Sequence, residues 1–171
     1  MVYRIFYALC VFGVLMLAAI SGLSVISITG RALTDFGLRP VPGDFEMVEA
    51  GTALAVFCFM PMCHLLRGHA NVDLFYQRFS PAFQRLIDAL CDGLMLVLWG
   101  VIAWRTTLAA MEFKANGELT FILQFPLWWP VTACALMAVL GCLAYAHKLL
   151  ETLGVLQTPA AFRPMSAAEK H

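Results

Sequence analysis

The segment GDFEMVEAGTALAVFCFMPMCHLLRGHANVD, residues 43–73, decides the fold class of this chain. It begins with a turn-forming glycine followed by Glu46 and Glu49, and it ends in a basic exit that contains Arg67 and His69. Between these ends lie 14 consecutive uncharged residues. An apolar helix with acids just inside one end and bases just outside the other is typical of a membrane span. The segment therefore predicts a transmembrane helix whose two ends are chemically distinct.

The composition of the whole chain agrees with a membrane protein. Of its 171 residues, 61% are hydrophobic and only 13% are charged, and the mean hydropathy is +0.81. Such a chain is too apolar to fold around a single water-soluble core. Its formal net charge of zero gives no reason to expect nucleic acid as a partner. The lipid bilayer is the expected environment.

Apolar runs divide the chain into four spans. The first, residues 5–30, has 26 residues without a charge. As a helix it would be about 39 Å long, which is enough to cross a hydrocarbon core of about 30 Å. We predict an all-α integral membrane fold with one domain over residues 1–150 and a cytoplasmic tail over 151–171. The four predicted spans are 5–30, 45–66, 86–110 and 126–146.

Prolines and polar caps predict how two of these spans begin and bend. Asp44 is expected to be the N-cap of the second span, and Pro61 is expected to bend that span near its end. Pro126 is expected at the first helical position of the fourth span. This start places Trp128 and Trp129 at the depth of the lipid headgroups, where they would act as interfacial anchors.

The segment between the second and third spans, residues 67–85, is amphipathic. Phe75, Phe79 and Phe83 recur at helical spacing on one face, and Asp73 belongs to the polar face. The dipeptide Ser80-Pro81 is typical of a helix start, with serine as the N-cap and proline in the first helical turn. We therefore expect an interfacial arm of two short helices that meet at Ser80.

Charged residues inside the third span must be compensated. Asp88 and Asp92 lie one turn apart near its start, and Arg105 lies near its end. Each charge costs roughly 3 kcal/mol near the centre of a bilayer, so these groups must reach an interface or form pairs. Glu49 and Arg105 should lie at similar depth, which makes them a possible ion pair.

The sequence is equally compatible with an arrangement without this ion pair, in which Glu49 reaches headgroup water and Arg105 extends to the interface. Arg31 and Arg39 are alternative partners for the acid, and Glu112 is an alternative partner for the base.

The six cysteines fall within apolar runs or at their edges, and no two form a CxxC pair. They are interpreted as packing residues with no redox role. The sequence assigns no catalytic residue, cofactor or metal site. Seven basic residues fall on one side of the predicted spans, two of them in the tail far from a span, and four fall on the other, which predicts that both termini are cytoplasmic.

Four stretches together resemble a known family. They are the G-D-F-E-x-V-E start of the second span, its late proline, the R-G-H-A-N-V-D-L-F-Y exit and the L-Q-F-P-L-W-W-P entry to the last span. This order resembles the small membrane subunit of TRAP transporters, the tripartite ATP-independent periplasmic carriers. The resemblance covers residues 3–150.

The resemblance implies a role for the chain in the bacterial inner membrane. In that family the small subunit has four membrane helices and interfacial arm helices, and it braces a large membrane subunit that holds the substrate and sodium sites. A periplasmic substrate-binding protein delivers the substrate, usually an organic acid. The chain would then be a scaffold and not an enzyme.

Three other classes remain open from the sequence. A b-type haem tetraspan oxidoreductase would need axial ligands, for which His64 and His147 are the candidates because both lie near the cytoplasmic ends of spans. A small drug exporter working alone would place a carboxylate in mid-membrane, whereas the acids here lie near span ends. A membrane adaptor of another complex would share the architecture and differ only in its partner.

Overall fold

The chain forms four long helices in a computed structural model that describes residues 2–68 and 80–156. They are α1 (Val2–Ala32), α2 (Asp44–Leu65), α4 (Pro81–Asn116) and α5 (Trp128–Thr152), with a short 3₁₀ helix, η1 (Thr34–Phe36), after α1. Each of the four is long and apolar enough to cross a membrane. The predicted all-α fold with four transmembrane helices is therefore confirmed.

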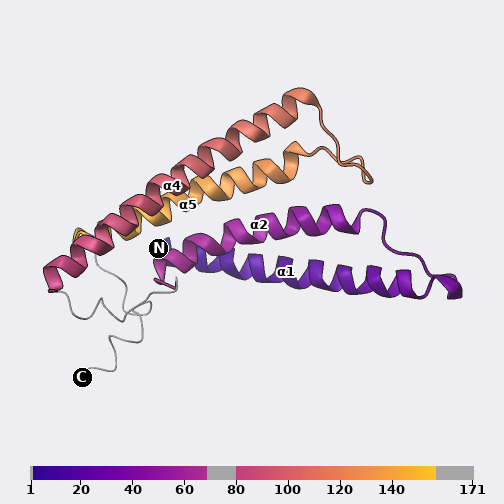
Figure 1. Cartoon of the computed structure of the whole chain (residues 1–171), viewed down its shortest axis with the longest axis horizontal. Coiled ribbons are helices and arrows are strands. Elements are labelled where there is room, and N and C mark those ends of the chain that lie inside the picture. Colours follow the sequence, from indigo (N-terminus) through magenta and orange to yellow (C-terminus); the bar gives the residue numbers. More distant parts are fainter. Residues whose placement is uncertain (1, 69–79, 157–171) are drawn as a thin grey trace, which may run out of the picture.

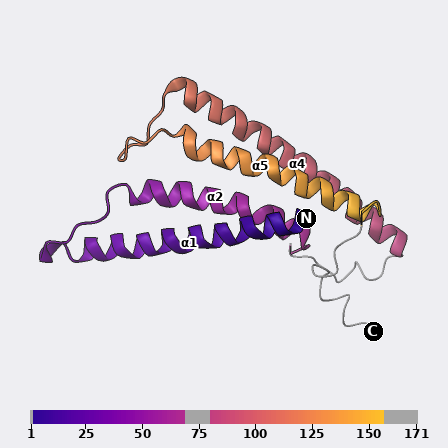
Figure 2. The same ribbon diagram turned by 180° about the vertical axis from the view of Figure 1, so that it is seen from behind.

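The four helices are arranged as two pairs. Helix α1 packs along α2, α4 packs along α5, and contacts between α2 and α5 join the pairs. The pairs lie close together at the end where the chain begins and diverge toward the other end (Figure 1). The view from behind shows the same V-shaped arrangement (Figure 2). The molecule therefore has a convergent end and a divergent end.

The seam between the pairs depends on one glycine. A Cβ atom at Gly141 of α5 would lie 2.3 Å from Nε1 of Trp99 and 3.1 Å from Cγ of Pro61. The absence of a side chain at Gly141 thus lets α5 approach both α4 and α2. The Trp99 indole N–H donates a hydrogen bond of 2.8 Å to the carbonyl of Ala138, which satisfies this buried polar group.

The seam between α1 and α2 is built in the same way near the divergent end. A Cβ atom at Gly51 would lie 2.8 Å from Cγ2 of Ile20. At the convergent end, a buried cluster joins α1 to α2 and α5; its members are Tyr3, Phe6, Met62, Leu65 and Ala144.

The third membrane helix is longer than the sequence predicted. It covers Pro81–Asn116 instead of 86–110, so the predicted second arm helix is the first part of α4 itself. Ser80 is its N-cap, as expected, and a proline follows at the start of the helix. Nothing in the sequence interrupts the helix before Gly117, whose left-handed φ of 64° ends it. The first predicted arm helix, with His69 and Asp73, falls mainly on residues 69–79, which lie outside the described residues.

Two predicted helix starts were wrong. Gly43 is the N-cap of α2, with a left-handed φ of 74°, and Asp44 is the first helical residue. Helix α5 begins at Trp128, because Pro126 forms an isolated antiparallel bridge with Leu119 in the preceding hairpin. Asp44 accepts a hydrogen bond from the Ser27 hydroxyl on α1, and Pro126 pairs with Leu119, and local capping preferences do not reveal such contacts.

Candidate functional site

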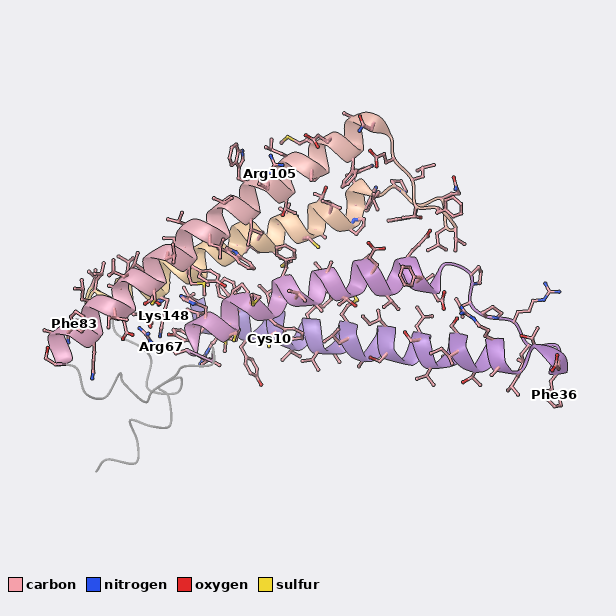
Figure 3. All side chains as sticks on the ribbon, in the orientation of Figure 1. Cys10, Phe36, Arg67, Phe83, Arg105 and Lys148 are labelled. Carbon is pink, nitrogen blue, oxygen red and sulfur yellow. The ribbon has the colours of Figure 1, made fainter. Side chains whose placement is uncertain are left out.

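Arg67, directly after α2, is the centre of a charged cluster at the convergent end. Its guanidinium lies 3.2 Å from Oδ1 of Asp88 and 3.3 Å from Oδ2 of Asp92. The backbone of Arg67 is left-handed, with a φ of 51°, which is uncommon for a residue other than glycine. Figure 3 shows Arg67 at the end where α2 approaches α4, close to Lys148 of α5. The two aspartates were expected either to reach an interface or to form ion pairs, and in the structure they form ion pairs.

Asp92 connects three helices. Its side chain is 4% exposed, and besides Arg67 it accepts a hydrogen bond from the hydroxyl of Thr152 on α5. Nε2 of His64 on α2 lies 3.4 Å from its other oxygen. Arg67 also donates to the Thr152 hydroxyl, at 2.9 Å. This carboxylate therefore has a cation, a hydroxyl and an imidazole around it.

Glu151 makes a corresponding set of contacts between α5 and α1. Its side chain is 3% exposed, and it accepts a hydrogen bond of 2.8 Å from the hydroxyl of Tyr3. Lys148, which is 7% exposed, lies 3.3 Å from the same carboxylate, and Nδ1 of His147 lies 3.4 Å from it. The Glu151 contacts thus attach the beginning of α1 to the end of α5.

Together these groups form what we call the polar clamp; its members are Tyr3, His64, Arg67, Asp88, Asp92, His147, Lys148, Glu151 and Thr152. The polar clamp contains residues of all four helices or of the turns directly after them. Buried charges of this kind are stable only when paired, and loss of one partner leaves the other uncompensated. The clamp therefore fixes the convergent end of the molecule.

Aromatic rings extend the clamp into the seam. The ring of His64 stacks on Tyr145 at 4.3 Å, and Tyr145 stacks on Trp99 at 5.1 Å. The ring of His147 meets Tyr3 edge to face at 5.9 Å. The two histidines considered as haem ligands are thus engaged by separate sets of protein groups.

At the divergent end, Glu46 attaches the loop before α5 to α2. Its carboxylate accepts hydrogen bonds from the backbone N–H groups of Ile122, at 2.6 Å, and Leu123, at 3.0 Å. These residues belong to the outer hairpin, residues 119–127, which the bridge between Leu119 and Pro126 closes. The sequence placed Glu46 correctly in the first turn of a helix but gave no sign of this partner.

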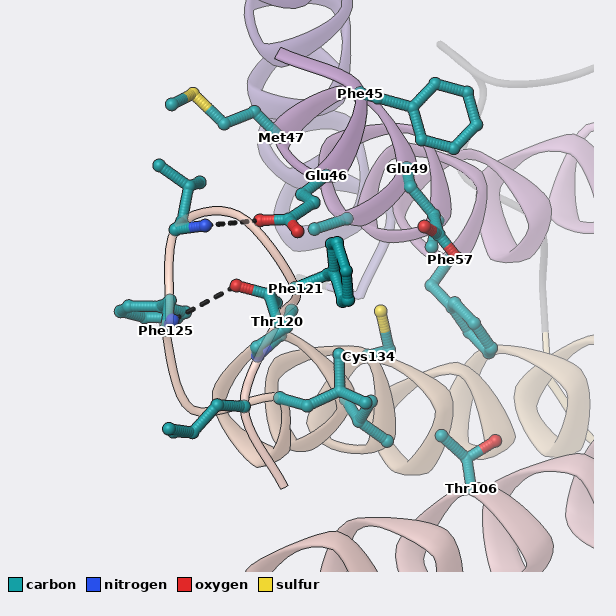
Figure 4. Close-up of a pocket in the computed structure, with 17 residues that line it drawn as sticks. Phe45, Glu46, Met47, Glu49, Phe57, Thr106, Thr120, Phe121, Phe125 and Cys134 are labelled. Atoms are coloured by element: carbon teal, nitrogen blue, oxygen red, sulfur yellow. Dashed lines mark hydrogen bonds between the residues drawn. The ribbon is translucent and has the colours of Figure 1, made fainter. Parts of the chain in front are cut away.

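A groove of about 850 Å³ lies beneath the outer hairpin, between the first turns of α2 and those of α5 (Figure 4). Phenylalanines line much of it, including Phe45, Phe57 and Phe121. Its polar groups include Glu46 and Glu49, and no basic residue in the described part of the chain lines it.

The other predicted site residues lie apart from one another. Within the described residues, no hydrogen bond or ion pair joins Glu49 to Arg105, and both side chains are exposed. Arg105 lies on α4 (Figure 3) and does not line the groove that Glu49 enters. Lys114 lies 5.2 Å from the centre of the Trp128 ring, and Trp129 is 57% exposed.

Sequence reasoning missed the α5 half of the polar clamp. Lys148 and Glu151 lie beyond the predicted end of the last span at 146, although their spacing of three residues and the nearby His147 are typical of one helix face. In the part of the chain that the structure describes, no three His, Cys, Asp or Glu side chains are grouped to hold a metal ion. All six cysteines are free thiols.

Four membrane-length helices joined by a buried polar cluster define a multi-pass membrane protein. The family model of the tripartite ATP-independent periplasmic transporters, DctQ component, matches residues 20–154. The chain belongs to this family, and it is therefore a small membrane component of a TRAP transporter. No curated protein and no solved structure matches it.

Proposed function

We propose that this chain is a non-catalytic subunit that braces the large membrane subunit of a TRAP transporter. In this role it forms part of the fixed framework against which the large subunit moves during sodium-coupled uptake of an organic acid. A periplasmic binding protein supplies the acid. The family match supports membership in a TRAP transporter, and the bracing role rests on the physical arguments below.

The distribution of burial between the helices carries this proposal. In the most apolar windows of α2 and α5, 39% and 33% of the residues are buried inside the chain. The corresponding values for α4 and α1 are 17% and 6%. The two outer helices therefore present wide apolar faces to the surroundings, where lipid or another membrane protein covers them. A larger subunit packed on one of these faces would be joined to a unit that the polar clamp holds together.

The polar clamp suits a brace because it makes the convergent end resistant to deformation. Its charges come from distant parts of the chain, and those of Asp92, Lys148 and Glu151 are buried. Separating the helices there would expose unpaired charges to lipid. In the proposed orientation this end faces the cytoplasm of a bacterial inner membrane, together with both termini. The loops at the divergent end are then available to the periplasmic binding protein.

The experiment that tests the proposal identifies the covalent neighbours of the two outer faces. A photoreactive amino acid replaces Val25 on α1 or Val97 on α4, each 64% exposed, and Ala138 on α5, 0% exposed, is the control position. We expect a crosslink to a larger membrane protein from at least one outer face and none from Ala138. Mass spectrometry of the crosslinked partner should identify a TRAP large subunit. A partner from an unrelated complex, or no protein partner from either face, would contradict the proposal.

A further inference from the structure

The groove at the divergent end has the depth of one membrane leaflet. It begins at Phe45, in the first turn of α2, and reaches Phe57, twelve residues further along the same helix. At 1.5 Å per residue this is about 18 Å, compared with about 15 Å for half of a bilayer core. The floor is closed, because Phe57 contacts the Trp99 ring at 5.6 Å and α5 meets Pro61 at Gly141 one turn below.

A closed floor determines what can enter the groove. A transmembrane helix needs an open path of about 30 Å and is about 10 Å wide, so it cannot continue past the point where α2 and α5 meet. A hydrocarbon chain that enters from the leaflet at the Asp44 end can stop at that floor. The apolar lining, which includes Phe45, Phe57 and Val131, matches such a chain.

The charges in the groove restrict which lipid headgroup could bind at its mouth. Both carboxylate oxygens of Glu46 already accept hydrogen bonds from the backbone of the outer hairpin. Glu49 lines the groove about 7.5 Å from the start of α2, and its carboxylate has no hydrogen bond or ion pair within the described residues. With two acids and no base, the groove repels an anionic headgroup and favours a cation that can donate hydrogen bonds.

We propose that the groove binds one phospholipid that carries a primary ammonium headgroup, as in phosphatidylethanolamine. The ammonium group donates to the carboxylate of Glu49, and one acyl chain lies along Phe45, Phe57 and Val131 toward the floor. The outer hairpin covers this chain. At the hairpin tip, Ile122, which is 55% exposed and does not line the groove, lies among the neighbouring lipids. The bound lipid fills the space between the two helix pairs where they diverge.

Native mass spectrometry of the full chain tests this proposal. The chain is extracted in mild detergent and titrated with dioleoyl phosphatidylethanolamine, phosphatidylcholine or phosphatidylglycerol. We expect one molecule of phosphatidylethanolamine to be retained about tenfold more strongly than phosphatidylcholine, because the quaternary ammonium of the latter cannot donate a hydrogen bond to Glu49. Phosphatidylglycerol should bind most weakly.

Two matched variants connect the preference to the groove. Glu49→Gln should reduce the retention of phosphatidylethanolamine to the level of phosphatidylcholine. Glu112→Gln removes an exposed acid of α4 that does not line the groove, and it should change nothing. Equal retention of the two lipids by the unaltered chain would overturn the proposal, and so would an equal effect of the two substitutions.

A photoreactive amino acid at Ala53, which lines the groove and is exposed, distinguishes lipid from protein in the native membrane. We expect an adduct with the mass of a phosphatidylethanolamine. A protein adduct at this position, or no adduct, would overturn the proposal. The lipid site does not depend on the bracing role, because its test needs neither a large subunit nor transport.

Discussion

At the scale of single residues, Arg67 is the cation that two carboxylates share. It pairs with Asp88 and Asp92, so Arg67→Gln leaves both acids without their cation. We expect a loss of roughly 2–4 kcal/mol in the free energy of unfolding, somewhat below the usual value for a buried pair because the guanidinium is partly exposed. Thermal unfolding of the chain in detergent measures this change.

A double substitution identifies the cause of that loss. Asp92→Asn combined with Arg67→Gln should cost clearly less than the sum of the two single changes, because it removes the buried charge of Asp92 and leaves only the partly exposed Asp88 without Arg67. Arg31→Gln is the control, since Arg31 is 69% exposed and lies 3.8 Å from Asp44, and it should have little effect. Strict additivity would show that the clamp residues do not act together.

Glu46 has a separate, directly measurable role in holding the outer hairpin. Glu46→Ala removes the acceptor of the Ile122 and Leu123 N–H groups. Hydrogen exchange of these two amides should become about tenfold faster or more. Glu49→Gln is the matched control because Glu49 accepts neither bond, and it should leave their exchange unchanged. Unaltered exchange in Glu46→Ala would mean that other contacts hold the hairpin.

The sequence revealed that these residues need partners but not which partners they have. The cost of burying Asp88 and Asp92 follows from their position in an apolar run alone. Their cation, Arg67, precedes them across residues that belong to no predicted span, and Thr152 follows Asp92 by 60 residues. Contacts between residues so distant in sequence depend on helix packing. For the same reason the depth argument for Glu49 and Arg105 could not determine whether the two side chains face each other.

At the scale of helices, the close approach at Gly141 makes a prediction about packing. A methyl group there would collide with Trp99, so Gly141→Ala should weaken the contact of α5 with α4 and α2. We expect a loss of roughly 1–3 kcal/mol in the free energy of unfolding. Gly100→Ala is the control, because nothing lies within 4 Å of a Cβ atom at Gly100 of α4. It should be neutral or stabilising by up to about 1 kcal/mol.

Both substitutions are compared by thermal unfolding in the same detergent. Equal melting temperatures of the two variants would contradict the assignment of Gly141 to the seam.

The existence of the helices could be predicted, whereas only some of their ends could. Long apolar runs locate all four spans because backbone groups in lipid must be satisfied within a helix. The ends were misplaced where charged side chains were taken to mark the limit of a helix. Helix α5 continues through Lys148 and Glu151 because their charges pair within the protein. Helix α4 likewise runs without a break from Pro81, where the sequence predicted the start of a separate short helix, into the predicted third span.

At the scale of the whole molecule, the two-pair arrangement predicts which surfaces are accessible from each side of the membrane. Phe36 in η1 is 82% exposed at the divergent end, and Arg85 is exposed near the start of α4 at the other end. Cys91, an exposed native cysteine, is first replaced by serine. Cysteines introduced at these two positions should then react differently with an impermeant thiol reagent. In the proposed orientation, Phe36→Cys reacts in cells whose outer membrane alone is permeable, and Arg85→Cys reacts only after the inner membrane is opened.

The reverse labelling pattern would invert the proposed orientation while leaving the fold unchanged.

The arrangement of the pairs lay beyond the reach of the sequence. The outer helices α1 and α4 are more apolar than α2 and α5, but hydropathy does not say which helices pair or how closely they approach. Close approach depends on the placement of small residues such as Gly141 and Gly51, which permit contact only when the facing surface is complementary. The groove at the divergent end follows from that arrangement and was likewise not predicted.

The central claim is that this chain braces a transporter and does not transport by itself. The most direct test is sodium-driven uptake of the organic acid into proteoliposomes that contain this chain alone, the large subunit alone, or both, each with the binding protein supplied outside. We predict uptake only when both membrane subunits and the binding protein are present. Sodium-driven uptake by proteoliposomes that contain this chain alone would contradict the account.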